Sequence, residues 1–425
     1  MRFIIKNGRM IKKGNELSNV DVLVENGKIL AIDEKLPTEE IEFDAKNGLI
    51  TPGLVDLHVH FRQPGFEYKE TIQTGSKAAA RGGYTTVCAM PNLNPTPDSV
   101  ENLEKVMEII DKDAVVKVLQ YATITENLRS EHLVDFKELS NSGAFAFTND
   151  GVGVQTAGVM YLAMEEAAKV GKAIVAHTED ESLLFQGAMH EGKRNKELGI
   201  PGILSVVESS QIARDLLLAE ATGVHYHVCH VSTKESVRII REAKKAGIQV
   251  SAEVCPHHLI LNDSYIPKDN AIWKMNPPLR ALEDQKALIE GLLDGTIDCI
   301  ATDHAPHAIE EKDTSFVNGM FGIVGSETAF SLMYTHFVET GIFTLEQLIN
   351  WMSVKPARLF KLPAGDLTIG SAADIAVFNI EDEVTIDSAD FESKSINTPF
   401  LGWKVKGETM MTFVDGKLAF QIEKF

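Results

Sequence analysis

Eight apolar, strand-like runs alternate with helical stretches through the middle of this chain of 425 residues. Such alternation is typical of a parallel β-sheet whose crossover connections are helices. Eight such units spread over more than about 250 residues predict a closed (β/α)8 barrel of the TIM type. The runs are 55–60, 85–90, 115–121, 144–148, 173–177, 224–230, 248–254 and 297–303.

The two ends of the chain have a different pattern. Short strand-like runs fill residues 1–49, where Asn26-Gly27 is a strong hairpin signal, and a second such turn stands at Asp415-Gly416. Neither end is long enough to bury a sheet face by itself. We therefore predict a small β-sandwich domain built from 1–49 plus 366–425, and a barrel domain over 50–365.

Charge and composition exclude several classes of partner. A formal net charge of -20 argues against a nucleic-acid or anionic-membrane surface, because both need clustered Lys and Arg. No apolar run approaches the length that spans a bilayer, and the start Met1-Arg2-Phe3 leads into a segment too short and polar for a signal peptide. We expect a cytoplasmic protein. Its four cysteines lie singly in apolar runs, as buried reduced thiols do.

The first barrel run ends in two histidines separated by one residue. Side chains alternate faces along a strand, so His58 and His60 point the same way and can share one cation. Taken alone, this pattern fits two core histidines equally well. The context favours a metal, because later runs also end in ligand-type residues and the active sites of this fold lie at the carboxyl ends of the strands. Those residues are Asp150, His177, His230 and Asp303.

Helix capping supports the placement of His230. Ser232-Thr233-Lys234-Glu235 fits a capping box that begins the next helix, so His230 lies just before that helix. Alternation then puts His225 and His227 on the opposite face of the strand, and we interpret them as structural. His257 and His258 follow the seventh run, and we assign them to packing.

The number of ligand-type residues indicates more than one metal ion. Six groups exceed the three protein ligands of a single catalytic zinc. We therefore predict two divalent cations held by a bridging carboxylate, with a hydroxide between them as the nucleophile at neutral pH. A structural zinc would show cysteine ligands, and the cysteines here have the wrong spacing.

Several motifs resemble the amidohydrolase superfamily and, within it, the class I dihydroorotases. The broad ones are 51–60, 301–307 and 370–377, and the more specific ones are 61–65, 90–92, 147–151, 276–280 and 321–325. The resemblance runs nearly end to end. Asn149 and Gln63 stand where the family often has Asp and Glu.

The resemblance implies the reversible cyclisation of N-carbamoyl-L-aspartate to L-dihydroorotate in pyrimidine (UMP) biosynthesis, with two zinc ions. In that scheme Asp150 bridges the metals and Asp303 contacts the first metal and acts as general acid and base on the hydroxide and the ring nitrogen. The remaining implied metal ligands are His58 and His60 for one ion and His177 and His230 for the other. The implied substrate contacts are Arg62, Asn92 and His307 to the carboxylate, and Asn276, Phe321 and Gly322 to the ring.

Two alternatives remain beside this interpretation. A dihydropyrimidinase, hydantoinase or allantoinase would share the fold but needs a carboxylated lysine at the end of strand four, and no lysine stands between Gly143 and Gly153. A non-catalytic scaffold for aspartate carbamoyltransferase would have lost metal ligands. The sequence leaves open a homodimer, a carbamoyltransferase partner, one metal against two, and whether 308–320 is a lid or a solvent loop.

The missing lysine gives a prediction. Zinc added to the metal-free protein should restore activity equally with and without bicarbonate, because the Asp150 carboxylate needs no CO2 to form. Activity during reconstitution in bicarbonate-depleted buffer is the measurement, with metal content of Asp150→Ala beside it. A requirement for bicarbonate, or full metal and full rate in Asp150→Ala, would mean that a lysine from another strand is the bridge.

Overall fold

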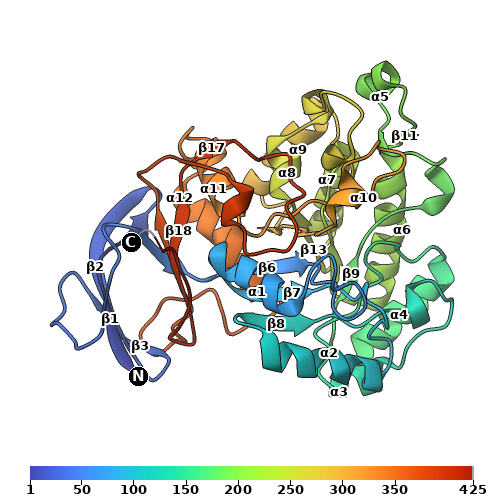
Figure 1. Cartoon of the computed structure of the whole chain (residues 1–425). Coiled ribbons are helices and arrows are strands. Elements are labelled where there is room, and N and C mark those ends of the chain that lie inside the picture. The colour runs from blue at the N-terminus through green and yellow to red at the C-terminus, as the bar shows by residue number, and fades with distance from the viewer. Residues whose placement is uncertain (424–425) are drawn as a thin grey trace.

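Strands from both ends of the chain form one sheet in this computed structural model, which describes residues 1–423 (Figure 1). The strand order is β3-β2-β1-β5-β15-β18-β19, with β4 also paired to β1. Both predicted hairpin turns are confirmed, since Glu25 pairs with Lys28 and Val414 with Lys417. The strands are β1 (Arg2–Lys13), β2 (Glu16–Glu25), β3 (Lys28–Asp33), β4 (Glu42–Asp44), β5 (Leu49–Pro52), β15 (Ile375–Asn379), β18 (Glu408–Val414) and β19 (Lys417–Gln421).

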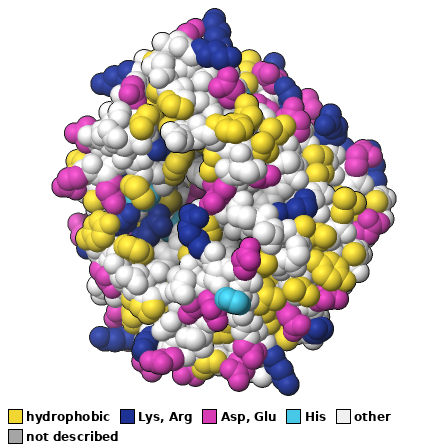
Figure 2. Space-filling model, turned by 90° about the vertical axis from the view of Figure 1, so that its right-hand side faces the viewer, with side chains coloured by type: hydrophobic (Ala, Val, Ile, Leu, Met, Phe, Trp, Pro, Cys, Tyr) yellow, Lys and Arg dark blue, Asp and Glu magenta, His cyan; other side chains and the backbone are white. Residues whose placement is uncertain are grey.

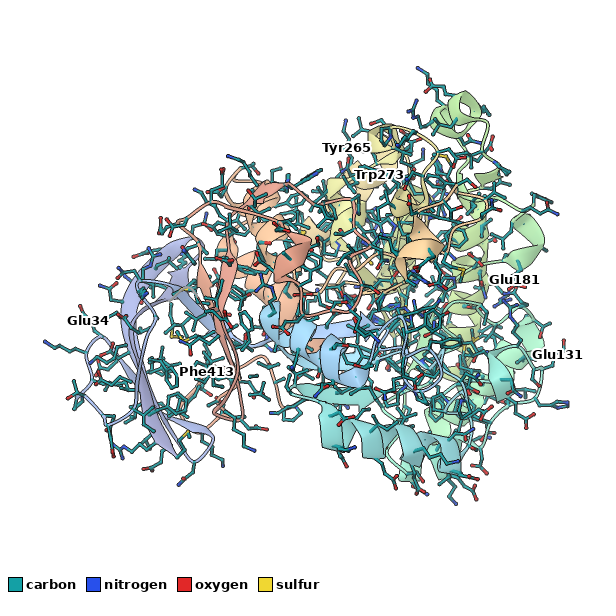
Figure 3. All side chains as sticks on the ribbon, in the orientation of Figure 1. Glu34, Glu131, Glu181, Tyr265, Trp273 and Phe413 are labelled. Atoms are coloured by element: carbon teal, nitrogen blue, oxygen red, sulfur yellow. The ribbon has the colours of Figure 1, made fainter. Side chains whose placement is uncertain are left out.

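The sheet folds over so that its early and late strands face each other across an apolar core. Phe413 on β18 (labelled in Figure 3) lies in this core. Phe3 on β1 stacks on it with ring centroids 5.2 Å apart, and Phe43 meets both rings edge-on. This arrangement is the sandwich expected from the two ends of the chain. The division at residues 49 and 50 stays a proposal, because β5 runs across it.

The middle of the chain forms a closed barrel of parallel strands. Assigned strands pair in two groups, β6-β7-β8 and β9-β12-β13-β14. Single bridges from Phe147 to Ala122 and Ile174 join the groups on one side, and a bridge from Val59 to His304 joins them on the other. The ring therefore contains eight strands, as predicted, with the fourth reduced to the bridges of Phe147. The assigned strands are β6 (Leu54–Val59), β7 (Tyr84–Ala89), β8 (Lys117–Gln120), β9 (Ile174–Ala176), β12 (Tyr226–Val228), β13 (Val250–Val254) and β14 (Cys299–Ile300).

One principal helix follows each barrel strand and packs an apolar stripe on the barrel. On α2 the buried side chains Leu103, Val106 and Ile110 follow helical spacing, and on α4 Met160 and Met164 are buried. The eight helices are α1 (Ile72–Arg81), α2 (Val100–Asp113), α3 (Phe136–Asn141), α4 (Ala157–Lys169), α6 (Val206–Thr222), α7 (Lys234–Lys245), α9 (Leu282–Leu293) and α11 (Ala329–Met333).

Shorter elements fill the connections. The helices are α5 (Lys193–Leu198), α8 (Pro256–Ile260), α10 (Ile309–Lys312), α12 (Leu345–Ile349) and α13 (Lys355–Leu359), and the short strands are β10 (Met189–His190), β11 (Gly202–Ile203), β16 (Val384–Thr385) and β17 (Lys404–Val405). Within residues 1–423, none of the helices combines the length and apolar composition that a membrane crossing needs.

The start of α7 differs from the predicted capping box. Thr233, not Ser232, is the N-cap, and its hydroxyl accepts the backbone N–H of Ser236. The carboxylate of Glu208 on α6 accepts the backbone N–H groups of both Ser232 and Thr233. The predicted box was wrong by one residue, because the buried carboxylate of Glu208 binds the backbone N–H of Ser232 that Glu235 was expected to bind. His230 still lies just before the helix.

Candidate metal centre and active site

All six predicted ligand-type side chains meet at the carboxyl ends of the barrel strands. Each is buried, with at most 6% of its surface exposed. One of them lies on β6, and the others lie just after β6, strand four, β9, β12 and β14. Five strands that are distant in sequence therefore contribute. The side chains are His58, His60, Asp150, His177, His230 and Asp303.

Asp150 lies at the centre of this cluster. Its two carboxylate oxygens face different histidines, which is the arrangement that a bridging ligand needs. Oδ2 is 3.5 Å from His60 Nε2. Oδ1 is 3.4 Å from His58 Nε2, 3.7 Å from His177 Nδ1 and 3.7 Å from His230 Nε2.

Asp303 faces His58 on β6 and His60 just after that strand. Its Oδ1 is 3.0 Å from His60 Nε2 and 3.3 Å from His58 Nε2. Asp303 has φ +49° and His230 has φ +30°, so both residues leave the extended strand conformation where they turn toward the cluster. Burial would raise the pKa of each of the two carboxyls, yet the neighbouring imidazoles hold the pKa of Asp150 and that of Asp303 below their usual values. Both are therefore carboxylates at neutral pH.

The donor set fits divalent cations. The neutral ring of His58 donates from Nδ1 to Glu253, so its Nε2 then presents a lone pair to the carboxylate oxygens of Asp150 and Asp303. Against the effect of burial, these carboxylates raise the pKa of His58, so at this position a metal ion would replace a proton. Within residues 1–423, neither His58 Nε2 nor Asp150 Oδ1 has a hydrogen-bond partner. Acceptors facing each other in a buried space need a cation between them. Their separations of 3.3 to 3.7 Å match the edge of roughly 3.4 Å of a tetrahedron with zinc–nitrogen bonds.

Glu253 on β13 fixes the orientation of His58. Its Oε1 lies 2.8 Å from His58 Nδ1. Burial alone would raise the pKa of Glu253, but the neighbouring His58 and His227 lower this pKa to about 2. An ionised carboxylate can only accept, so Nδ1 carries the proton and Nε2 is left to bind a metal. Sequence reasoning missed Glu253. The sequence feature that could have indicated Glu253 is that it is the single charged residue in the strand-like run 248–254.

A chain of hydrogen bonds continues from Glu253 through the barrel interior. His227 Nε2 lies 3.0 Å from Glu253 Oε2, and Ser251 Oγ lies 2.7 Å from both His227 Nδ1 and His225 Nε2. His227 must donate to the carboxylate, so its Nδ1 accepts from the serine hydroxyl. The two histidines do not face the metal cluster directly, but His227 supports it through Glu253.

A cavity of about 450 Å³ opens beside the metal cluster, and Figure 2 shows a hollow in this face of the molecule with Lys and Arg side chains around it. The segment 317–320, within the predicted lid or solvent loop, forms part of the cavity wall. All six predicted substrate-binding residues line the cavity: Arg62, Asn92, Asn276, His307, Phe321 and Gly322.

Three donors gather on one side of the cavity. Arg62 is buried and has φ +61°. Its guanidinium donates from Nε to the carbonyl of Pro306 at 3.3 Å. Asn92 accepts from His60 Nδ1 at 2.8 Å through Oδ1, so its Nδ2 remains as a donor. His307 lies 3.4 Å from Arg62 Nη2. A single carboxylate could accept from all three.

The opposite wall presents an acceptor. Asn276 donates from Nδ2 to Glu179 Oε2 at 2.6 Å, which leaves its Oδ1 to accept an N–H group from a ligand. Gly322 has φ +132°, and a Cβ there would lie 2.6 Å from Ala305 and 3.1 Å from His307 Nε2. The close approach of this backbone to the cavity therefore requires glycine.

The remaining candidates do not enter the metal cluster. Lys274, a cavity lysine, donates to the carbonyl of Gly319 at 2.6 Å and lies over the ring of Phe321, so it is not a bridge beside Asp150. His258 donates through Nε2 to the carbonyl of Pro277 at 2.9 Å, which is a structural contact. His257 is buried beside it.

Comparison with known sequences gives full-length relatives. A model of the Dihydro-orotase-like family matches residues 47–236. The chain is 68% identical to a protein of Enterococcus faecalis named dihydroorotase over 425 residues, which cover 100% of both chains. It is 58% identical over 423 residues to a dihydroorotase of Staphylococcus aureus, covering 99% of this chain and 100% of the relative.

The solved structures that resemble this fold are named hydantoinases, unlike the relatives found by sequence. An L-hydantoinase (dihydropyrimidinase) from Arthrobacter aurescens superposes with a TM-score of 0.88 at 27% identity, covering 99% of this chain and 96% of its own. A D-hydantoinase (dihydropyrimidinase) from Thermus sp. gives a TM-score of 0.85 at 26% identity, covering 100% and 96%. These similarities extend over both the barrel and the terminal sheet.

The hydrogen bond between Glu253 and His58 generates a prediction. Glu253→Gln should weaken zinc binding roughly 10- to 100-fold, because an amide cannot accept from two imidazole N–H groups and one histidine must change its tautomer. Competition with a chelator measures the affinity. His225→Gln is the matched control at the far end of the same chain and should bind zinc as the parent protein does. Unchanged zinc affinity in Glu253→Gln would contradict the orienting role.

Proposed function

The chain belongs to the dihydroorotase family, and from this we propose that it catalyses the reversible cyclisation of N-carbamoyl-L-aspartate to L-dihydroorotate in pyrimidine biosynthesis. One observation of the structure carries the proposal: a set of donors suited to a carboxylate lies in the same cavity as six metal-ligand side chains. A small-molecule substrate is the only partner that this reaction requires.

We assign the metal centre to two zinc ions. His58 and His60 would hold one, His177 and His230 the other, and Asp150 would bridge them, since its two oxygens face different histidines. When bound, the ions polarise the reacting carbonyl and lower the pKa of a water molecule, which supplies a nucleophile at neutral pH. The lone pairs that face each other around Asp150 support this assignment.

The substrate carboxylate would bind to Arg62, Asn92 and His307. Arg62 offers a planar pair of N–H groups and supplies the local positive charge that an anionic substrate needs in an acidic protein. Asn276 would accept an N–H group of the ring through Oδ1, and the glycine backbone at Gly322 allows the ring to approach. Substrate held at both ends presents its amide to the metal side of the cavity.

Asp303 is the proposed general base and acid. Its imidazole neighbours keep it ionised, so in the direction of ring opening it can accept a proton from the attacking water. It then returns that proton to the ring nitrogen as the C–N bond breaks. In ring closure the same group takes the proton from the nitrogen.

The hydantoinase alternative rests on structural similarity at 27% identity or less. It requires a lysine at the end of strand four, and the chain has Asp150 there with no lysine from Gly143 to Gly153. The scaffold alternative predicts lost metal ligands, whereas six ligand-type side chains are present and converge.

Hydrolysis assays on four substrates test the function. The purified protein should open L-dihydroorotate and should act far more slowly on dihydrouracil, hydantoin and allantoin. Metal content of the same preparation separates an enzyme from a scaffold. Turnover of hydantoin or dihydrouracil without turnover of dihydroorotate would overturn the proposal, as would a metal-free protein that acts on none of them.

Asp303→Asn should retain the fold and most of the metal but lose roughly a hundredfold or more in kcat, which is the usual contribution of positioned acid–base catalysis. Steady-state kinetics with dihydroorotate measures the loss. The matched control is Asp298→Asn, which alters a buried carboxylate just before the same strand, paired there with Lys244 and Lys355. Near-parental turnover by Asp303→Asn would remove Asp303 from the reaction.

A further inference from the structure

We propose that Lys69 is a positioning residue that holds His307 in the tautomer with its proton on Nε2, so that His307 donates to the substrate carboxylate. This inference rests on the proposed function, because that function places a carboxylate beside His307. Lys69 was not among the predicted site residues, and it does not line the cavity. It follows Arg62 by seven positions, in the segment between β6 and α1.

The partners of the two ring nitrogens indicate which nitrogen of His307 carries the proton. Its Nε2 lies 2.7 Å from the carbonyl oxygen of Phe321, and a carbonyl can only accept, so Nε2 carries a hydrogen. Its Nδ1 lies 3.2 Å from Nζ of Lys69, and an ammonium can only donate. Nδ1 is therefore the acceptor. Arg62 Nη2, which can only donate, also lies 3.4 Å from Nε2, but the contact of Nε2 with Phe321 is 0.7 Å shorter and decides the donor at this nitrogen. The contacts with Phe321 and Lys69 together fit the neutral Nε2–H tautomer.

A doubly protonated ring is disfavoured here. His307 is buried, and burial together with the charges of Arg62, Lys69 and Lys312 holds its pKa well below the usual value. The ring thus has one proton to place on one of two nitrogens. The neighbours of those nitrogens decide its position.

Without Lys69, a second neighbour would favour the other nitrogen. Oε2 of Glu311 lies 3.4 Å from Nδ1 of His307, and a carboxylate next to a ring nitrogen attracts a proton to that nitrogen. Lys69 prevents this because its Nζ lies 2.9 Å from Oε1 of the same carboxylate and donates to Nδ1 as well. The ammonium therefore satisfies Glu311 and blocks the competing tautomer.

The position of Lys69 is itself tightly held. Its side chain is 7% exposed, and its Nζ lies 5.8 Å and 5.5 Å from the ring centroids of Phe66 and Tyr68. Tyr68 also donates to Oε1 of Glu311 at 3.2 Å. Glu311 in turn accepts the backbone N–H of Ala308 at the start of α10. An immobilised ammonium of this kind can fix a tautomer because it cannot turn away from Nδ1.

The tautomer decides what the cavity offers to an anion. With the proton on Nε2, the N–H that donates to the carbonyl of Phe321 can be shared with a carboxylate that enters beside it, and Arg62 Nη2, 3.4 Å from Nε2, can donate to the same carboxylate. With the proton on Nδ1, the lone pair of Nε2 would face the same carboxylate and repel it. Lys69 would therefore act on substrate affinity without contacting the substrate.

Two measurements on Lys69→Met test the proposal. Methionine keeps an unbranched stem beside Phe66 and Tyr68 but has no donor. The KM for L-dihydroorotate should rise roughly tenfold or more with kcat little changed, as expected when one hydrogen bond to a charged group is lost equally from ground state and transition state. Long-range proton–nitrogen NMR of 15N-histidine-labelled full-length protein, with the signal assigned through His307→Gln, reports which nitrogen carries the proton.

We expect the parent protein to show the proton of His307 on Nε2 and Lys69→Met to show it wholly or partly on Nδ1. Glu311→Gln is the matched control: it removes the ion-pair partner of Lys69 but keeps the ammonium donor, so Nε2–H should persist and KM should stay near the parental value. A change in Lys69→Met that Glu311→Gln does not share supports donation to Nδ1 as the cause.

Three results would overturn the proposal: a parental His307 with its proton on Nδ1, a Lys69→Met protein with unchanged tautomer, or a changed tautomer with unchanged KM. The first is read from the parent protein, so it applies even where the variant does not fold. Absence of dihydroorotate turnover in the parent would refute the proposed function instead, and the NMR spectra would then decide the role of Lys69 without kinetics.

Discussion

Closure of the barrel is the interaction on which the rest of the structure depends. The backbone N–H of His60 donates to the carbonyl of His304 at 2.8 Å, which joins the first strand to the last. This bond places His60 and Asp303 side by side although 243 positions separate them. Each of the other ligand-type side chains then takes its place from a strand already fixed in the ring, so the geometry of the metal cluster follows from the hydrogen bonding of the sheet.

Burial makes that geometry useful for chemistry. Four imidazoles and two carboxylates lie in a space with almost no exposed surface, where unpaired lone pairs are costly. Glu253 and Asn92 each accept a hydrogen bond from a histidine Nδ1, which leaves the Nε2 atoms of His58 and His60 directed at the metal cluster. On the substrate side, Glu179 accepts from Asn276, and Lys69 donates to His307 Nδ1. Polar and charged groups around the site thus decide which atoms of the metal and substrate ligands donate and which accept.

The sequence predicted the fold and the metal cluster because both leave local patterns. Alternating apolar runs indicate strands, and ligand-type residues at their ends indicate convergence at one mouth. Glu253, Lys69 and the true cap of α7 were missed because each depends on a partner distant in the sequence: His58, His307 and Glu208 respectively. Strand four was predicted over 144–148, yet only Phe147 forms bridges there. No residue pattern shows how many ladder positions a short strand will use.

The terminal sheet has a consequence for synthesis of the protein. Strand β5 is paired with β15, which begins about 320 residues later in the chain. At typical elongation rates of 5–20 residues per second, the free edge of β5 waits roughly 20 to 60 s for its partner on the ribosome. An unpaired edge is a site for wrong association between chains. Pro52 at the end of β5 removes one donor from that edge, and the N-terminal strands can complete their sheet only when nearly the whole polypeptide has been made.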